Sequence, residues 1–179
     1  MKHTIVALVE NKPGVLNRVA SLFRRRNFNI DSLTVGRTDN PHISRMTIVM
    51  DSDADPDQVQ KQLYKLINVI HVEDVTHLPG VSRDLALIKI QVDSQTRSEV
   101  VQLCEIFRAR IVDVTPESVI VEITGDEQKI DSLLELLRPI GIVEMVRTGV
   151  VTMTRGENVM KSNGYKPRTV GNGHRATIL

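Results

Sequence analysis

The sequence is short of cysteine, of aromatic residues and of net charge. Its single cysteine, Cys104, excludes an intramolecular disulfide framework and favours a reducing compartment. Aromatic residues make up 3% of the chain and tryptophan is absent, which argues against a stacking platform for single-stranded nucleic acid. The 23 basic residues are balanced by 22 acidic ones, whereas proteins that bind a phosphate backbone usually carry a basic excess. We therefore expect no nucleic acid partner.

Long apolar runs are also missing. No run approaches the ~20 residues that a helix needs to span a bilayer. The first residues, Met1 to Thr4, lead straight into a strand-like run and lack the apolar segment and cleavage site of a signal peptide. We therefore expect a cytoplasmic protein with no membrane partner.

Motifs for metal binding and for catalysis are missing as well. The histidines His71 and His77 would lie ~20 Å apart along a strand, and there is no Cys-x-x-Cys or His-x-x-x-His spacing, so we expect no metal site. No Walker loop, Gly-x-Ser-x-Gly or Gly-x-Gly-x-x-Gly sequence occurs. Cys104 shares an apolar helix face with Val100 and Phe107, which favours a buried core thiol over a nucleophile. We expect no catalytic residues and no cofactor in this chain.

The first half of the chain shows the order βαββαβ. A β-branched run at 4–9 predicts a strand that is buried on both faces. Apolar residues at helical spacing follow over 15–23, and Arg24 to Arg26 favour a helix end there. The remaining elements expected in this half are strands at 27–35 and 44–50, a helix over 55–67 that is capped by Asp55, and a strand at 69–75.

The same order returns after Pro79 and Gly80. The elements expected here are a half-buried strand ending at 92, a helix from a capping box at 96–99 to 107, strands at 111–114 and 119–123, a helix over 130–137 and a strand at 142–146. The pattern therefore predicts an α+β fold of two ferredoxin-like βαββαβ units, with antiparallel sheets and helices on one face. Units of this size bury little surface and often gain stability by pairing. The expected division is 1–78, a linker at 79–83, a second unit at 84–154 and a tail at 155–179.

The tail has a composition of its own. It is rich in glycine and asparagine, and five basic residues face the single acid Glu157. Such a composition predicts a flexible segment, for which the sequence suggests no role.

One group of residues stands out as a candidate binding site. Asn11 and Gly14 lie in the turn from the first strand to the first helix, where free backbone N–H groups and the helix dipole can hold a carboxylate. Asn29 offers a second amide, and the apolar side chains of a pocket come from Val15, Leu16 and Ile30. This set suits a branched aliphatic amino acid. The same residues also fit an ordinary turn with a Pro-Gly helix start. From the residues alone, both interpretations, a binding site and an ordinary turn, stay open.

At these residues the sequence resembles the ACT domain, and more specifically the regulatory (small) subunits of acetolactate synthase, also called acetohydroxyacid synthase. The resemblance covers about residues 2–160. It rests on the stretches Glu10–Leu16, Asn27–Val35, Ser44–Thr47, Glu105–Arg108, Ile111–Pro116, Arg147–Val151 and Thr154–Gly156.

The resemblance implies a homodimer that pairs through its ACT domains and binds a separate catalytic subunit. That catalytic subunit uses thiamine diphosphate, magnesium and often FAD to condense two pyruvates to 2-acetolactate and carbon dioxide. The small subunit would raise its activity and confer feedback inhibition by valine in branched-chain amino acid biosynthesis. The implied valine site takes Asn11, Gly14, Val15 and Leu16 from one chain and Asn29 and Ile30 from the other.

Two other classes of function stay open at this point. A free-standing ACT-type sensor could regulate another enzyme or transcription, although the first strand begins at Thr4 and leaves no room upstream for a helix-turn-helix. A small enzyme is opposed by the missing catalytic motifs. Leucine or isoleucine would fit a similar pocket, and the surface that contacts a catalytic subunit is not evident from the sequence.

Overall fold

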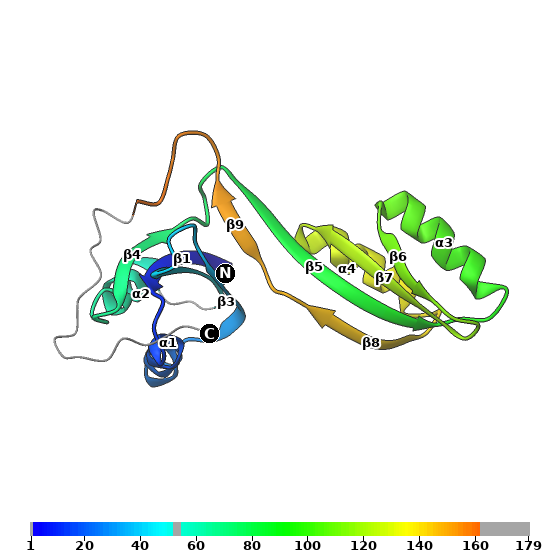
Figure 1. Cartoon of the computed structure of the whole chain (residues 1–179), viewed down its shortest axis with the longest axis horizontal. Helices are drawn as coiled ribbons and strands as arrows, with labels where there is room; N and C mark the ends of the chain where they lie inside the picture. The colour runs from blue at the N-terminus through cyan, green and yellow to red at the C-terminus, as the bar shows by residue number, and fades with distance from the viewer. Residues whose placement is uncertain (1, 52–54, 162–179) are drawn as a thin grey trace.

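The structure, a computed structural model, describes residues 2–51 and 55–161. The N-terminal unit (Figure 1) is one antiparallel sheet in the order β2-β3-β1-β4 with two helices. Its elements are β1 (Lys2–Glu10), α1 (Val15–Arg25), β2 (Ile30–Arg37), β3 (Ile43–Asp51), α2 (Pro56–Leu63) and β4 (Val69–Asp74). The βαββαβ order predicted from the sequence is confirmed.

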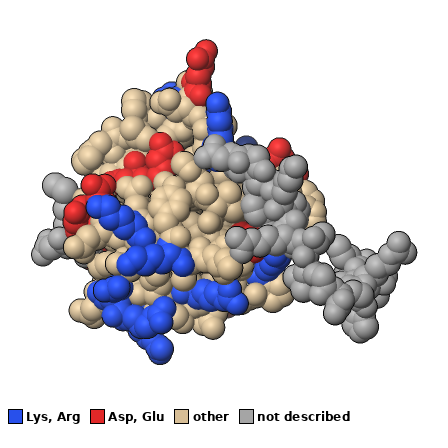
Figure 2. Space-filling model, turned by 90° about the vertical axis from the view of Figure 1, so that its left-hand side faces the viewer, with Lys and Arg blue, Asp and Glu red and all other residues tan. Residues whose placement is uncertain are grey.

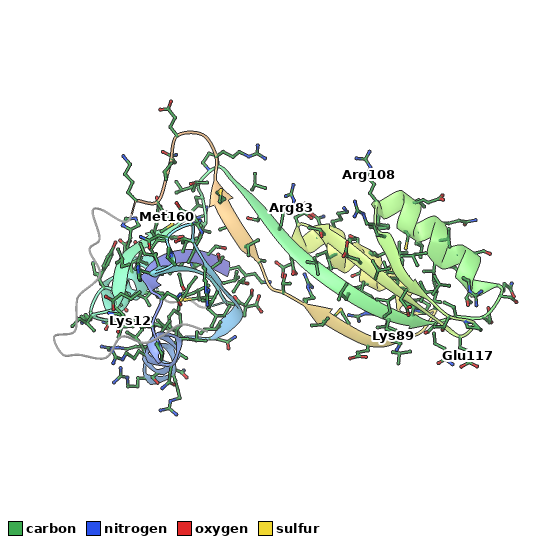
Figure 3. The ribbon with its side chains drawn as sticks, in the orientation of Figure 1. Lys12, Arg83, Lys89, Arg108, Glu117 and Met160 are labelled. Carbon is green, nitrogen blue, oxygen red and sulfur yellow. The ribbon has the colours of Figure 1, made fainter. Side chains whose placement is uncertain are left out.

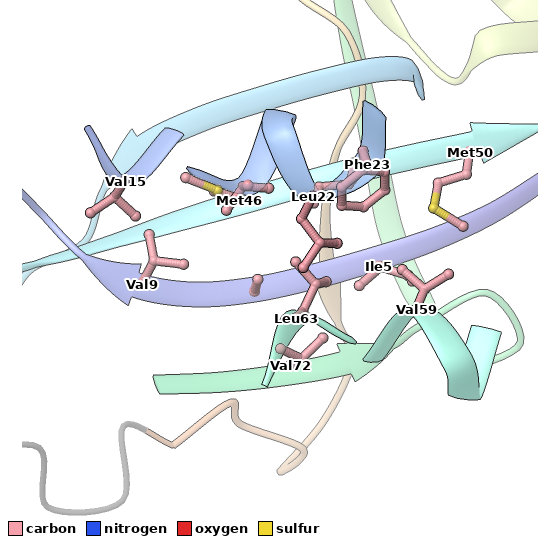
Figure 4. Close-up of a cluster of buried hydrophobic side chains, with 13 residues drawn as sticks. Ile5, Val9, Val15, Leu22, Phe23, Met46, Met50, Val59, Leu63 and Val72 are labelled. Atoms are coloured by element: carbon pink, nitrogen blue, oxygen red, sulfur yellow. The ribbon is translucent and has the colours of Figure 1, made fainter. Parts of the chain in front are cut away.

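The core of this unit lies between the sheet and its two helices (Figure 4). Helix α1 turns its apolar stripe inward, so that Val19 and Phe23 are at most 1% exposed. From α2, Val59 and Leu63 complete the layer over Ile5 and Val72. The apolar spacing read from the sequence thus sets which face of each helix is buried.

Helix α1 ends in a compact cap that delays the start of β2. Asn27 adopts a left-handed conformation with φ 56°, and the Phe28 N–H returns to the carbonyl of Phe23 at 3.0 Å. The rings of Phe23 and Phe28 pack edge to face, with centroids 5.9 Å apart. The expected strand at 27–35 was therefore placed too early, because residues 27 and 28 belong to the helix cap.

The C-terminal unit repeats the arrangement with the sheet order β6-β7-β5-β8. Its elements are β5 (Gly80–Gln91), α3 (Thr96–Phe107), β6 (Arg110–Val114), β7 (Ser118–Gly125), α4 (Glu127–Leu137) and β8 (Ile142–Arg147). Ile88, Ile90 and the predicted core thiol Cys104 are buried among the helix residues of this unit. The α+β fold of two ferredoxin-like units is thus confirmed, with each sheet covered by helices on one face.

Residues 80–83, which fall in the expected linker, are strand rather than loop. They pair with β9 (Val151–Thr154), an element that the sequence analysis did not anticipate. Together the first part of β5 and β9 form a two-stranded ribbon that runs between the units (Figure 1). The ribbon packs on the second face of the N-terminal sheet, where the Arg45 guanidinium donates to the Thr152 carbonyl at 2.8 Å. β9 was not predicted from the sequence because it is short and its Met153 is 65% exposed.

Two smaller expectations also need correction. Helix α2 ends at Leu63, and Ile67, which was assigned to its apolar face, is 65% exposed. At α3 the expected capping box is replaced by Asp93, whose carboxylate accepts from the backbone N–H groups of Gln95 and Thr96.

The tail is described only as far as residue 161. Its first residue is tied to the ribbon, since Arg155 donates its N–H to the Pro79 carbonyl at 2.8 Å. The remaining residues of the tail, 162–179, for which flexibility was expected, lie outside the described residues. No helix in the described part of the chain is long and apolar enough to cross a membrane.

Candidate functional site

The turn between β1 and α1 is held in place by its own backbone. Asn11 donates its N–H to the His42 carbonyl at 2.8 Å and its side-chain amide to the Pro41 carbonyl at 2.9 Å. Gly14 then turns the chain into the helix with φ 82°, a conformation that favours glycine. A Cβ on Gly14 would meet no atom of the described residues within 4 Å, so these residues leave the space next to this turn open.

Helix α1 differs from the other helices in having no anionic cap. Asp55 and Asp126 are the N-cap residues of α2 and α4 and accept from the first turn with their carboxylates. Before α3, the Asp93 carboxylate accepts from the N–H groups of Thr96 and of the N-cap residue Gln95. At α1 the N-cap position is Gly14, no side chain in the described part of the protein caps the first turn, and that turn carries no acid. The backbone N–H groups of Leu16 and Asn17 have no acceptor among the described residues. This helix end therefore has the donors and the positive dipole that bind a carboxylate.

A buried polar network supports the turn from below. Glu10, which ends β1 with 5% of its side chain exposed, accepts from the Asn68 amide at 2.5 Å and pairs with the Lys12 ammonium at 3.2 Å. Arg18 in turn donates to Asn68 at 2.5 Å. The sequence analysis missed this network, although a glutamate that ends an apolar strand is a signal that could have revealed it.

Basic side chains surround this part of the N-terminal unit. Figure 2 shows Lys and Arg side chains gathered on the lower half of the N-terminal end of the molecule, the side on which α1 lies in Figure 1. Lys12 and Arg18 flank the start of α1, and Arg24 and Arg25 lie in its last turn. The positive potential of Lys12 and Arg18 favours anionic groups near the turn.

The candidate site residues differ in how far their side chains are exposed. The side chain of Val15 is 4% exposed and belongs to the core, so it cannot line a ligand pocket. The side chain of Leu16, beside the turn, is 46% exposed. Asn29 is exposed, and Ile30 packs partly against the core at the start of β2.

Within one chain, Asn29 does not lie beside Asn11. Strand register places Ile30 opposite Met50, and Met50 opposite His3, near the beginning of β1. The turn at Asn11 follows the other end of β1, about 23 Å away at ~3.3 Å per residue. The two amides can therefore act on one small ligand only if they come from two chains.

Cys104 and the acidic residues give no sign of chemistry of their own. Burial raises the pKa of the Cys104 thiol, which keeps it protonated and unreactive. Across residues 2–51 and 55–161, no group of three His, Cys, Asp or Glu side chains is placed to hold a metal ion.

Comparison with known proteins covers both units. A family model described as the small subunit of acetolactate synthase matches residues 83–156, and one described as an AHAS small subunit-like ACT domain matches residues 5–71. Over 157 residues the chain is 55% identical to the probable acetolactate synthase small subunit of Archaeoglobus fulgidus, a match that covers 87% of this chain and 98% of that protein.

Two further relatives agree with this result. Identity to the acetolactate synthase small subunit of Mycobacterium leprae is 52% over 155 residues, covering 86% of this chain and 92% of that one. The crystal structure of the acetolactate synthase small subunit from Thermotoga maritima is similar with a TM-score of 0.82 at 44% identity, covering 89% of this chain and 99% of that chain.

Proposed function

The chain belongs to the family of acetolactate synthase small subunits, and from that premise we propose that it is the non-catalytic regulatory subunit of acetolactate synthase. The observation that carries the proposal is the match to small subunits along both units of the chain. Its partner would be a catalytic subunit that holds thiamine diphosphate, magnesium and often FAD and works in the cytoplasm. This chain would raise the rate of that subunit and make it sensitive to valine.

Valine would bind at the open end of α1. Its carboxylate meets the free N–H groups of Leu16 and Asn17, close to the positive charges of Lys12 and Arg18. Its ammonium group takes the side-chain oxygen of Asn29 from a second chain, and its isopropyl group lies against Leu16 of the first chain and Ile30 of the second.

A homodimer follows from this site, because one chain separates its two halves by about 23 Å along β1. The strand β2 lies at the edge of the sheet and is available for pairing with a second copy. Two-fold pairing along β2 would bring the beginning of one β2 near the end of the other, on the side of the partner's α1 turn. Each dimer would then hold two equivalent sites.

Inhibition follows if valine favours one arrangement of the two chains and the catalytic subunit favours another. Coupling of this kind is typically ~1–3 kcal/mol, which changes an affinity about 5- to 150-fold. It is reciprocal, so the catalytic subunit would weaken valine binding by the same factor.

The test is reconstitution with the cognate catalytic subunit. Adding this chain should raise the rate of acetolactate formation, and valine should then lower it. The variant Gly14→Asp places a carboxylate where that of valine would sit, so it should still activate while the valine concentration for half-inhibition rises about tenfold or more (~1.4 kcal/mol). Gly14→Asn is the matched control, because it adds a Cβ of the same kind without the charge and should stay closer to the wild type.

The same variant tests whether the site is shared between chains. Gly14→Asp and Asn29→Ala should each weaken valine inhibition alone, whereas an equal mixture of the two should regain part of it, because a mixed dimer has one undamaged site. A mixture that stays insensitive would place both residues in the same site of one chain. Failure of the wild-type chain to activate would overturn the proposed function itself.

A further inference from the structure

A cavity of about 240 Å³ lies between the N-terminal sheet and the ribbon of β5 and β9, away from the turn at Gly14. Three of its lining residues are arginines: Arg37 from β2, Arg45 from β3 and Arg83 from β5. No acidic residue lines it, and none of these arginines has a carboxylate within 4.0 Å among the described residues. Figure 3 shows Arg83 on β5 and Met160 beside the N-terminal unit.

Arg45 is the central residue of this cavity. Its guanidinium is half-buried, yet its acceptors are the Thr152 carbonyl at 2.8 Å and the weakly accepting Met160 sulfur at 3.4 Å. Burial lowers the pKa of Arg45, and the more distant carboxylate of Glu73 offsets this in part. A charge that is taken out of water in this way is normally paired with an opposite charge.

Arg147, at the end of β8, is a comparable arginine that does have carboxylate partners. Its side chain is 24% exposed and pairs with two carboxylates, those of Asp84 at 2.6 Å and Asp131 at 2.7 Å. Arg45 has no such partner in the described part of the chain, although it lines two cavities. The second, of about 480 Å³, shares Arg37, Arg45 and Met153 with the first. One acid, Asp39, lines that second cavity.

The remaining walls of the first cavity are largely apolar. Val81, Val151 and Met153 form one side of the ribbon, and Gly36 leaves room on the side of the sheet. A guanidinium group can bind a carboxylate or a phosphate through two parallel hydrogen bonds. The site therefore combines a cationic end with an apolar wall in a volume that suits a molecule of few atoms.

We propose that this cavity binds a small organic anion, whose carboxylate or phosphate head pairs with Arg45 and Arg37 and whose short apolar body lies against Val81, Val151 and Met153. The ligand would link the N-terminal sheet to the ribbon that joins the two units. The site is separate from the turn at Gly14 and does not depend on the proposed function.

The experiment is calorimetric titration of the full chain at low chloride concentration with three probes. Isovalerate has a carboxylate and an apolar body, inorganic phosphate has the anionic head alone, and isovaleramide has the body without the charge. We expect isovalerate to bind with a Kd on the order of 1 mM and the amide not to bind. Tighter binding of phosphate than of isovalerate would assign the site to phosphate groups.

Two variants locate the binding. Arg45→Gln should weaken it about tenfold or more, and Arg138→Gln, which changes the exposed arginine that follows the last residue of α4, should leave it unchanged. Gly36→Val keeps all charges, and its Cβ meets no atom of the described residues within 4 Å, so it should keep the melting temperature and still block the cavity. Absence of binding by both anions, or equal binding by wild type, Arg45→Gln and Gly36→Val, would overturn the proposal.

Discussion

The two units of this chain differ in how the first helix begins after the first strand. In the C-terminal unit, the Asp93 carboxylate accepts from the N–H groups of Gln95 and Thr96 at 2.9 and 2.8 Å, so the end of α3 is filled by the chain itself. In the N-terminal unit, the equivalent place is Gly14, and the end of α1 is left open. Equal topology therefore leaves only one of these two turns free to take a carboxylate from a ligand.

The second faces of the two sheets differ as well. In β1, every residue from Ile5 to Glu10 is buried, because helices cover one face and the ribbon of β5 and β9 covers the other. In β5, burial alternates from Asp84 to Ile90, and Leu85, Leu87 and Lys89 are only partly covered. The alternation shows that, in a single chain, the C-terminal sheet has one packed face and one open face.

The largest effect is expected at the junction that lets the ribbon cover the N-terminal sheet. Asp84 is 3% exposed and accepts from Arg147 and from the Gly149 N–H, which lies next to Ser32 and Thr34 of β2. Asp84→Ala leaves Arg147 with one exposed partner and should lower the free energy of unfolding by about 3 kcal/mol in urea titrations.

Asp131→Ala is the control for this change, since it removes the other partner of the same arginine. The Asp131 side chain is 50% exposed, so its loss should cost less than about 1 kcal/mol. Equal losses for both variants would show that burial at the junction contributes nothing.

A smaller effect is expected where the two units are joined by charge. The Lys2 ammonium lies 3.0 Å from Asp31 in β2 and 2.6 Å from Glu127 in α4, and these pairs raise the pKa of Lys2. All three side chains are largely exposed, so Glu127→Gln should cost about 0.5 kcal/mol at low salt and less in 1 M salt.

Glu99→Gln serves as the matched control in the same denaturation experiment. Glu99 also lies in the first turn of its helix, α3, but makes no ion pair among the described residues. The two losses should differ by the contribution of the Lys2 pair. A loss at Glu127 that does not shrink with salt would argue against that pair.

The smallest effect is expected at the start of α3, where the Asp93 carboxylate accepts from the backbone N–H groups. Hydrogen bonds from Thr96 and Gln95 lower the pKa of Asp93 below its unfolded value of about 3.9. A carboxyl group of this kind adds stability above its unfolded pKa, and that stability is lost as the pH falls through the lower folded value. Asp93→Asn should therefore melt slightly below the wild type at pH 7, and the two should converge as the pH falls below the lowered pKa of Asp93 in the folded state. A difference that persists there would mean that the charge of Asp93 is not what caps α3.

Most elements of the fold could be predicted because they rest on local patterns. The apolar spacing of Val15, Val19 and Phe23 gave α1, and the Asp55-Pro56 pair gave the start of α2. The elements that were predicted wrongly depend on contacts between distant parts of the chain. β9 exists because Gly80 to Arg83 offer it an edge, and Ile67 lies outside α2 because the chain must turn there to reach β4.

The candidate site divides in the same way. Gly14 and Asn11 could be found from the sequence, since a Pro-Gly pair after an apolar strand marks a turn into a helix. The place of Asn29 could not, because strand register alone sets it at the far end of β1. The support of the turn by Glu10 and Asn68, 58 residues apart, is likewise a long-range contact with no local pattern.

The sequence by itself determined the two βαββαβ units, their buried helix faces and the family to which the chain belongs, since periodicity and short motifs are local properties of the chain. Only the tertiary structure decided that the end of α1 is open while that of α3 is closed, that a ribbon covers one sheet and not the other, and that Arg45 is half-buried with no carboxylate of the described residues within 4.0 Å. These features depend on which groups meet across the fold, and such meetings are set by packing and register rather than by the order of neighbouring residues.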